Sequence, residues 1–320
     1  MAIFQNNVLQ GVTANVIQGM QRRKNFGGME IARPQEQNSL SVNYPVIEIE
    51  DNVGIQDLLE KRAFGALFKQ ADSQIKLDTS TIEGDGLEMP IDNSIISDAT
   101  KSGLDKLSQM AFSLMNSAFI RHENKVAAVC QGSAFDSVNS VNAYTSANSA
   151  TANPLVDFYD AIERVYGRGE NPDTIVIPID VWTRIRTFDK FKGSIKGQNA
   201  PDFIRLRDLI EYFAEDGITK IIIGRGRQNT AAKGKAASVT PIWSNSHIWV
   251  GSTDAAAETG DANSLGMSVA TFYNADHPQP YFIEEYESKE RRSQVLRVYG
   301  ETNVKVINAR AGTRIATQFA

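Results

Sequence analysis

Cysteine is almost absent from this chain of 320 residues, and long apolar runs are missing altogether. The single cysteine, Cys130, cannot form a disulfide within the chain, which fits folding in a reducing cytoplasm. Nowhere do eighteen apolar residues follow one another, and the N-terminal MAIFQNNVLQGV lacks a basic stretch followed by an apolar one. We therefore expect neither secretion nor a membrane span.

An excess of positive charge is also missing. Lysine and arginine number 33 against 38 aspartates and glutamates, which gives a net charge of −5. A dedicated nucleic-acid binder usually carries a basic surface, so any contact with nucleic acid should be local and non-specific. The remaining composition, 42% hydrophobic and 22% charged residues, is ordinary for a folded protein.

Motifs that carry catalytic chemistry are scarce. After an apolar strand, Gly224-Arg225-Gly226 begins like a dinucleotide-binding fingerprint, but Asn229 replaces the third glycine and loop sequence follows in place of a helix. The segment Lys233-Gly234-Lys235 lacks the other residues of a phosphate-binding loop and indicates a basic surface loop. The three histidines are far apart and show no metal-ligand spacing: His122, His247 and His277. We expect no catalytic residues, no cofactor and no metal site.

The C-terminal part of the chain is dominated by β-type residues. Residues 280–309, PYFIEEYESKERRSQVLRVYGETNVKVINA, interleave β-branched and aromatic residues with charged ones, which predicts long antiparallel strands flanked by solvent. Charges of both signs gather where the two strands join. Taken singly, each of these charges is explained by a solvated surface. Taken together, they are our candidates for ionic contacts between subunits: Glu284, Glu285, Glu287, Lys289, Arg291 and Arg292.

The first forty-three residues indicate an arm. Apolar residues recur at helical spacing from Val8 to Met20 and predict a short amphipathic helix, followed by polar sequence. A helix this short needs a partner surface, either on its own domain or on a neighbouring subunit. Residues 44–95 then indicate a protruding hairpin, with strands near 66–82 and 86–91 and a turn signal at Gly84-Asp85-Gly86.

Residues 97–129 repeat apolar side chains every three and four positions without a proline, which predicts one helix about 48 Å long. Residues 131–152 are rich in Ser, Asn, Ala and Thr and predict a surface loop. Helices and strands then alternate, which indicates an α/β or α+β domain. The predicted helices lie at 155–165, around Trp182 and over 206–210, and the predicted strands at 174–178, 220–224 and 248–252.

This order of parts resembles the major capsid protein of tailed double-stranded DNA phages, which has the Hong Kong 97-type fold. The segments that carry the resemblance are residues 171–178 with Trp182, residues 218–224, Trp243 with residues 248–251, and the C-terminal VYGETNVKVINARAG. They occur in the family's order over nearly the whole chain. The resemblance implies an α+β fold with an N-terminal arm (1–43), an extended loop (44–95), a peripheral domain with a long spine helix (96–150 and 265–320) and an axial α/β domain (151–264).

The resemblance also implies a function. The protein would form the hexamers and pentamers of an icosahedral head that encloses double-stranded DNA, as part of a virion assembled in the host cytoplasm. Because only some forty residues precede the extended loop, we expect a separate scaffolding protein or none; a portal and a decoration protein are further partners implied. Some family members, though not most, crosslink a loop lysine to an asparagine of a neighbour. Here Lys61, Lys69 and Lys76 lie in or beside the predicted loop, and Asn303 and Asn308 lie on the closing strands.

Two alternatives remain open from the sequence. A bacterial nanocompartment, or encapsulin-like, shell has the same fold and encloses enzymes in place of a genome. An α/β enzyme or ligand-binding protein built on residues 151–264 would need a pocket with convergent polar groups and a titratable residue of perturbed pKa.

Overall fold

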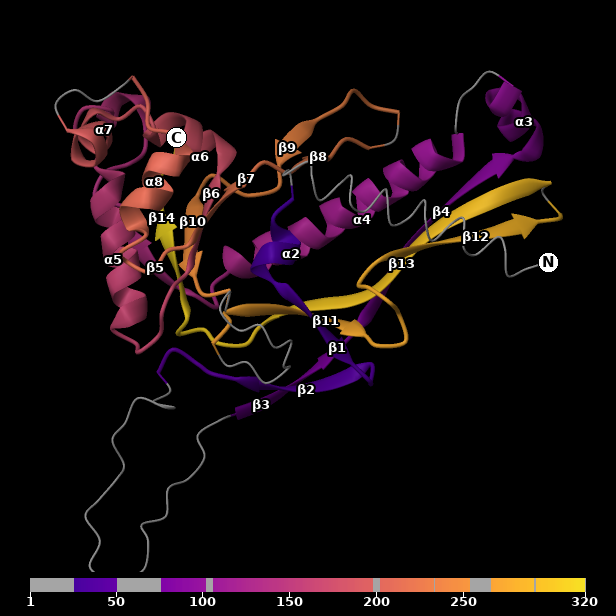
Figure 1. The fold of residues 1–320 in the computed structure, drawn as a ribbon, viewed down its shortest axis with the longest axis horizontal. Helices are drawn as coiled ribbons and strands as arrows, with labels where there is room; N and C mark the ends of the chain where they lie inside the picture. Colours follow the sequence, from indigo (N-terminus) through magenta and orange to yellow (C-terminus); the bar gives the residue numbers. More distant parts are fainter. Residues whose placement is uncertain are drawn as a thin grey trace, which may run out of the picture.

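The computed structural model describes residues 26–50, 76–101, 106–197, 202–232, 234–253, 266–290 and 292–319. Its two main sheets have five strands each: the first lies along one long helix, α4 (Lys106–Cys130), and the second lies at the C-terminal end of that helix (Figure 1). At 1.5 Å per residue, the 25 residues of α4 span about 37 Å. No helix in the described part of the chain combines the length and apolar content that crossing a bilayer requires.

The first sheet is organised by a single long strand, β13 (Ser293–Val306), of 14 residues. Strand β4 (Glu83–Asp92) runs antiparallel along one edge of β13. Strands β12 (Phe282–Ser288) and β11 (Val269–Asn274) follow one another along its other edge, and β1 (Arg33–Gln37) adds a parallel strand beyond β11. The paired strands β12, β13 and β4 form a ribbon that extends away from the second sheet (Figure 1). The predicted long, charge-interleaved C-terminal strands are therefore confirmed.

The second sheet has the order β5-β14-β10-β6-β7. Strand β6 (Thr174–Pro178), which lies between β10 and β7, is buried along its whole length, as its apolar sequence predicts. The other strands are β5 (Asp136–Asn139), β14 (Gly312–Ala316), β10 (His247–Gly251) and β7 (Lys220–Gly224). Four helices cover one face of this sheet: α5 (Pro154–Tyr166), α6 (Ile179–Ile185), α7 (Asp189–Lys196) and α8 (Leu206–Phe213).

Helix α4 joins the two sheets because its apolar stripe is continuous. Its first half, from Met110 to Phe119, packs on the ribbon residues Leu296 and Val298. Its last turns, from Val126 to Cys130, pack on the face of the second sheet that α5–α8 leave uncovered. A three- and four-residue spacing keeps both sets of side chains on the same side of the helix. The second sheet and helices α5–α8 confirm the strands and helices that the sequence predicts between 154 and 251.

Several sequence-based predictions differ from the structure. Within the range 97–129 expected as one helix, the structure describes two, α3 (Asn93–Lys101) and α4 (Lys106–Cys130), and residues 102–105 lie outside the described residues. The hairpin turn at Gly84-Asp85-Gly86 is wrong, because β4 continues through it and pairs with β13. The strand before it, β3 (Lys76–Thr81), pairs instead with β2 (Ser41–Val46) in a two-stranded ribbon.

The predicted surface loop at 131–152 is wrong in part. It contains β5, and it buries Tyr144, whose hydroxyl donates a hydrogen bond of 2.7 Å to Asp157 on α5. Strands β5 and β14 lie in the second sheet, although the sequence-based boundaries at 150/151 and 264/265 place both with the first. The described part of the predicted arm also lies inside the fold, since β1 pairs with β11. The helix expected from Val8 to Met20 lies outside the described residues.

Gly300 occupies the point on β13 where its neighbour changes from β12 to β11. A Cβ atom here would lie well inside van der Waals contact with the Pro280 carbonyl oxygen and the Tyr281 ring. We expect Gly300→Ala to lower the free energy of unfolding by about 1–3 kcal/mol, measured by urea denaturation. The control is Gly193→Ala in α7, where the new methyl group meets nothing within 4 Å. This control should gain about 0.5–1 kcal/mol, and equal effects at the two positions would contradict the packing argument.

Candidate assembly interface

The far end of the ribbon carries the charged residues that the sequence singles out. Strands β12 and β13 are joined there by residues 289–292, next to α3 and remote from α5–α8 (Figure 1). In this turn Arg292 has a left-handed φ of 46° and its carbonyl accepts a hydrogen bond from the Asn93 backbone N–H. The turn is therefore tied to the start of α3.

One of the predicted contact residues, Glu284, is already paired within the chain. Its carboxylate binds the Arg297 guanidinium on the neighbouring strand, with a distance of 3.1 Å from Nε. Arg297 also lies 3.6 Å from the Glu88 carboxylate on β4, and the Tyr286 hydroxyl donates a bond of 3.2 Å to the same carboxylate. These four side chains link the three strands across one face of the ribbon. The pairing raises the pKa of Arg297, first through its hydrogen bond to Glu284.

The other predicted contact residues differ in exposure. Glu285 is half-buried, and burial raises the pKa of its carboxyl group. Glu287, Lys289 and Arg292 are exposed at the tip of the ribbon. Arg291 lies outside the described residues. The structure thus brings charges of both signs together at the tip, while their role in contacts between subunits stays a prediction.

The residues that the resemblance suggests for crosslinking are engaged where the structure describes them. Lys76 forms an ion pair of 2.7 Å with Glu48. Asn303 donates hydrogen bonds to the Ser80 hydroxyl and the Thr81 carbonyl oxygen. Asn308 is fully buried and donates a bond of 2.9 Å to Glu170. Lys61 and Lys69 lie outside the described residues.

A buried carboxylate on α4, that of Glu123, is the centre of a second group of polar contacts, which the sequence analysis did not single out. The Glu123 carboxylate accepts hydrogen bonds from the backbone N–H groups of Gly27, at 3.3 Å, and Gly28, at 2.6 Å. It also accepts one of 2.5 Å from the Trp243 indole N–H. These bonds connect α4 to the segment that begins α2 (Gly28–Ile31) and to the loop before β10. Burial raises the pKa of Glu123, and the three donors oppose that rise.

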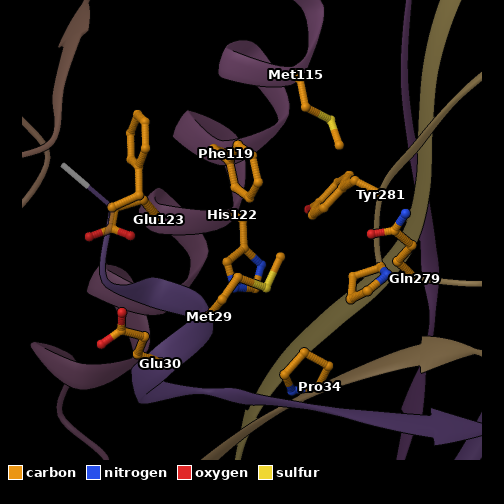
Figure 2. A pocket seen from close by; sticks show the side chains of 11 residues that line it. Met29, Glu30, Pro34, Met115, Phe119, His122, Glu123, Gln279 and Tyr281 are labelled. Carbon is orange, nitrogen blue, oxygen red and sulfur yellow. The ribbon is translucent and has the colours of Figure 1, made fainter. Parts of the chain in front are cut away.

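A pocket of about 400 Å³ opens beside this carboxylate, between α2, α4 and the start of β12. Figure 2 shows His122 beside Met29, on the side of α4 that faces Tyr281, with Phe119 and Met115 on the preceding turns of α4. Within the described residues, neither ring nitrogen of His122 has a hydrogen-bond partner. Burial, followed by the charge of Lys125, lowers the pKa of His122 to about 4, so the imidazole is neutral at pH 7.

The loop that begins like a dinucleotide-binding fingerprint has a plain structural role. Gly224 packs against the Trp243 ring, where a Cβ atom would clash. The chain then enters β8 (Arg227–Asn229), paired with β9 (Val239–Pro241), in place of the helix that a pyrophosphate site requires. Among the described residues, no group of His, Cys, Asp and Glu side chains has a metal-binding arrangement.

Comparisons with known proteins show which solved structures have a similar fold. No protein-family model matches the chain, and no curated protein matches its sequence. A phage-related protein of Bordetella bronchiseptica RB50 has a similar structure, with a TM-score of 0.67, 17% identity and 92% of both chains covered. The capsid of the cyanophage P-SCSP1u gives a TM-score of 0.52 at 11% identity, covering 91% of this chain and 86% of that one. The chain has the Hong Kong 97-type capsid fold.

The capsid fold is not confined to phage heads. An encapsulin from Synechococcus elongatus, solved as its holo complex, matches with a TM-score of 0.51 and 12% identity, covering 90% of this chain and 86% of that one. The predicted fold class is confirmed: long spine helix, ribbon and helix-covered sheet occur in one chain of mixed α and β structure. The boundaries proposed for the arm, loop, peripheral and axial domains stay predictions.

A sequence signal for Glu123 does exist. In the capsid fold's long helix, Glu123 follows Phe119 by four residues and precedes Val126 by three, so it interrupts the apolar stripe. A carboxylate on a buried face requires donors, and a Gly-Gly pair upstream offers free backbone N–H groups. Which donors these are depends on tertiary contacts 95 residues apart, which no local pattern gives.

Proposed function

We propose that this protein is a shell subunit that assembles into the hexamers and pentamers of an icosahedral phage head. One observation carries the proposal: the chain shares its fold, over about nine-tenths of its length, with the capsid of the cyanophage P-SCSP1u. The elongated ribbon suits such a role, because it presents contact surfaces away from the second sheet and its helices (Figure 1).

Assembly of this kind uses heterologous contacts, in which two different surfaces of one chain meet on neighbouring copies. Such contacts close into rings when the rotation between copies permits it. The tip of the ribbon, with Glu287, Lys289 and Arg292 exposed, provides one mixed-charge surface for them. Exposed pairs of this kind contribute little energy singly, so they set the orientation of the subunits more than their affinity.

The contents of the particle distinguish a phage head from the alternative, an encapsulin-like nanocompartment shell. In a phage head, double-stranded DNA fills the shell, and with a net charge of −5 the subunit contacts it locally and without sequence preference. A scaffolding protein, a portal and a decoration protein would complete a virion that assembles in the host cytoplasm. In a nanocompartment, an enzyme cargo would take the place of DNA.

Particles from the native source separate these two functions. After nuclease treatment of the exterior, we expect the ultraviolet absorbance of intact particles to be dominated by protected double-stranded DNA. Particles that contain protein cargo and no nucleic acid would contradict the phage head and favour the encapsulin-like shell.

The pocket beside His122 is the observation that favours an alternative of another class, a ligand-binding protein, but it lies outside residues 151–264, on which the sequence analysis builds that alternative. It combines apolar walls with a histidine of strongly lowered pKa. Its carboxylate, Glu123, is however held by three structural hydrogen bonds. A stable monomer that binds a small molecule there, and never assembles, would replace the shell proposal.

A further inference from the structure

An exposed aromatic and acidic surface lies on the outer side of α5, away from the second sheet. Val156, Tyr159, Asp160, Glu163 and Tyr166 are spaced by three and four residues, so they share one side of the helix. The three apolar or aromatic members are 37–43% exposed, although large apolar side chains are usually covered. We call this surface, completed by Tyr212, Glu215 and Asp216 at the end of α8, the tyrosine ledge.

The tyrosine ledge is held in a fixed shape by its own contacts. The rings of Tyr159 and Tyr212 lie 6.4 Å apart, and those of Tyr159 and Phe213 lie 5.6 Å apart. The Tyr166 hydroxyl donates a hydrogen bond of 2.8 Å to the carbonyl oxygen of Asp216. Rigid tyrosines cost little conformational entropy on binding and are enriched at interfaces between proteins.

Charge gives the ledge a preferred partner. Asp160 and Glu163 lie on the exposed side of α5, and Glu215 and Asp216 follow α8, whereas Asp157 is buried against Tyr144 and Glu211 is paired with Arg207. We call the second sheet with helices α5–α8 the axial lobe. Among the ion pairs that the described residues form in this lobe, none uses Asp160, Glu163 or Glu215. A basic surface on another protein would therefore complement the ledge.

The same lobe carries such a basic surface. Phe203 is 40% exposed and has the Arg186 guanidinium 4.1 Å above its ring centroid, and Lys190 on α7 and Arg205 at the start of α8 are exposed. We call these four residues the basic patch. They lie on and between α6, α7 and the start of α8, whereas the ledge runs along α5, so the two surfaces occupy different parts of one lobe (Figure 1). One chain thus bears two different, complementary surfaces, as a head-to-tail contact requires.

We propose that the tyrosine ledge of one copy binds the basic patch of the next copy, and that this contact closes the rings of the shell. The inference rests on the proposed shell function and assigns the surfaces that the axial lobe uses in it. Aromatic rings on both sides supply the apolar centre of the contact, and the surrounding charges fix which surfaces meet.

Charge exchange tests this pairing. Variant A (Asp160→Lys with Glu163→Lys) makes the ledge basic, and variant B (Lys190→Glu with Arg205→Glu) makes the patch acidic. We expect each alone to lower the fraction of protein in rings or shells at least tenfold, measured by sedimentation velocity. Combining all four changes in one chain should restore assembly, because each basic ledge then meets an acidic patch. Mixing A with B should restore six-membered rings, in which the two variants can alternate. The control, Asp160→Glu with Glu163→Asp, keeps the charges and should assemble like the wild type.

The outcomes separate this inference from the function on which it rests. If the wild-type chain never forms rings or shells, the proposed function itself fails. If the wild type assembles and variant A or variant B does so equally well, the ledge-to-patch contact is wrong while the shell function stands. If A and B both fail and the fourfold variant is not restored, the two surfaces do not pair with one another. Unchanged circular dichroism of A and B shows that each variant has folded.

Discussion

Replacing Glu123 by leucine is expected to lower the free energy of unfolding by about 3–5 kcal/mol. The Glu123 carboxylate is 1% exposed and accepts bonds from Gly27, Gly28 and Trp243. A leucine of similar size fills the space but leaves three buried N–H donors without an acceptor, and each such donor costs about 1–3 kcal/mol. Urea denaturation of the unassembled chain measures the loss.

The matched control is Glu211→Leu on α8, a glutamate that is exposed and paired with Arg207 on the surface. Its removal should change the free energy of unfolding by less than about 1 kcal/mol, as is usual for a surface pair. Similar losses for the two variants would contradict the assignment of Glu123 as the acceptor that ties α2, α4 and the Trp243 loop together. Glu123→Gln should fall between them, because an amide keeps one acceptor oxygen and points hydrogens at the remaining donors.

The second prediction with a large effect is that protonation of His122 lowers the free energy of unfolding between pH 6.5 and pH 4. Its pKa is about 4 in the folded chain against an ordinary value of 6.5, because burial disfavours the charged imidazolium. The unfolded chain therefore binds the proton more readily between these two values. Stability from this group is full above pH 6.5 and falls as the pH drops to 4, by about 3 kcal/mol in total. His122→Gln, which cannot titrate, should lose about 3 kcal/mol less than the wild type between pH 7 and pH 4.

The neighbours of His122 have to be kept constant in that comparison. Lys125 lowers the pKa of His122 further, and Glu123 titrates with the opposite sign. Since burial raises the pKa of Glu123, this carboxyl group adds stability as the pH falls through its folded pKa towards its ordinary value. Both the wild type and His122→Gln retain Glu123 and Lys125, so their difference reports His122 alone. Parallel stability curves from pH 7 to pH 4 would contradict a buried, neutral His122.

The elements of the second sheet were predictable because each has one local cause. Strand β6, TIVIP, is a short apolar run next to a helix signal, and β7, KIIIG, ends at a glycine. Helix α5 begins with a proline at its first turn and repeats its apolar residues every three or four positions. For such segments, local propensity and tertiary packing favour the same structure.

The pairing of strands was not predictable in the same way. Gly84-Asp85-Gly86 has the composition of a turn, yet the Tyr299 ring packs over both glycines and holds them in β4. The partner strand lies more than 200 residues away, so no local pattern reveals the contact. The loop-like composition of residues 131–152 is likewise overridden by Asp157, which fixes Tyr144 and the Val141 backbone N–H.

The candidate site shows the same division between composition and contacts. A cluster of charges at 284–292 was visible in the sequence, whereas its internal pairing was not. Glu284 binds Arg297 because the register of β12 and β13 places these two residues opposite one another. The tyrosine ledge depends on the approach of α5 to the end of α8, and its exposure follows from which side of each helix the second sheet covers.

The most direct measurement is the size of the purified chain by sedimentation velocity, with negative-stain images of the same sample. If the protein is a shell subunit with the capsid fold, it sediments as capsomer rings or closed particles, and the images show five- and six-fold rings or icosahedral shells. A chain that remains a monomer of 35.2 kDa under crowding and with its scaffolding protein supplied would contradict the account.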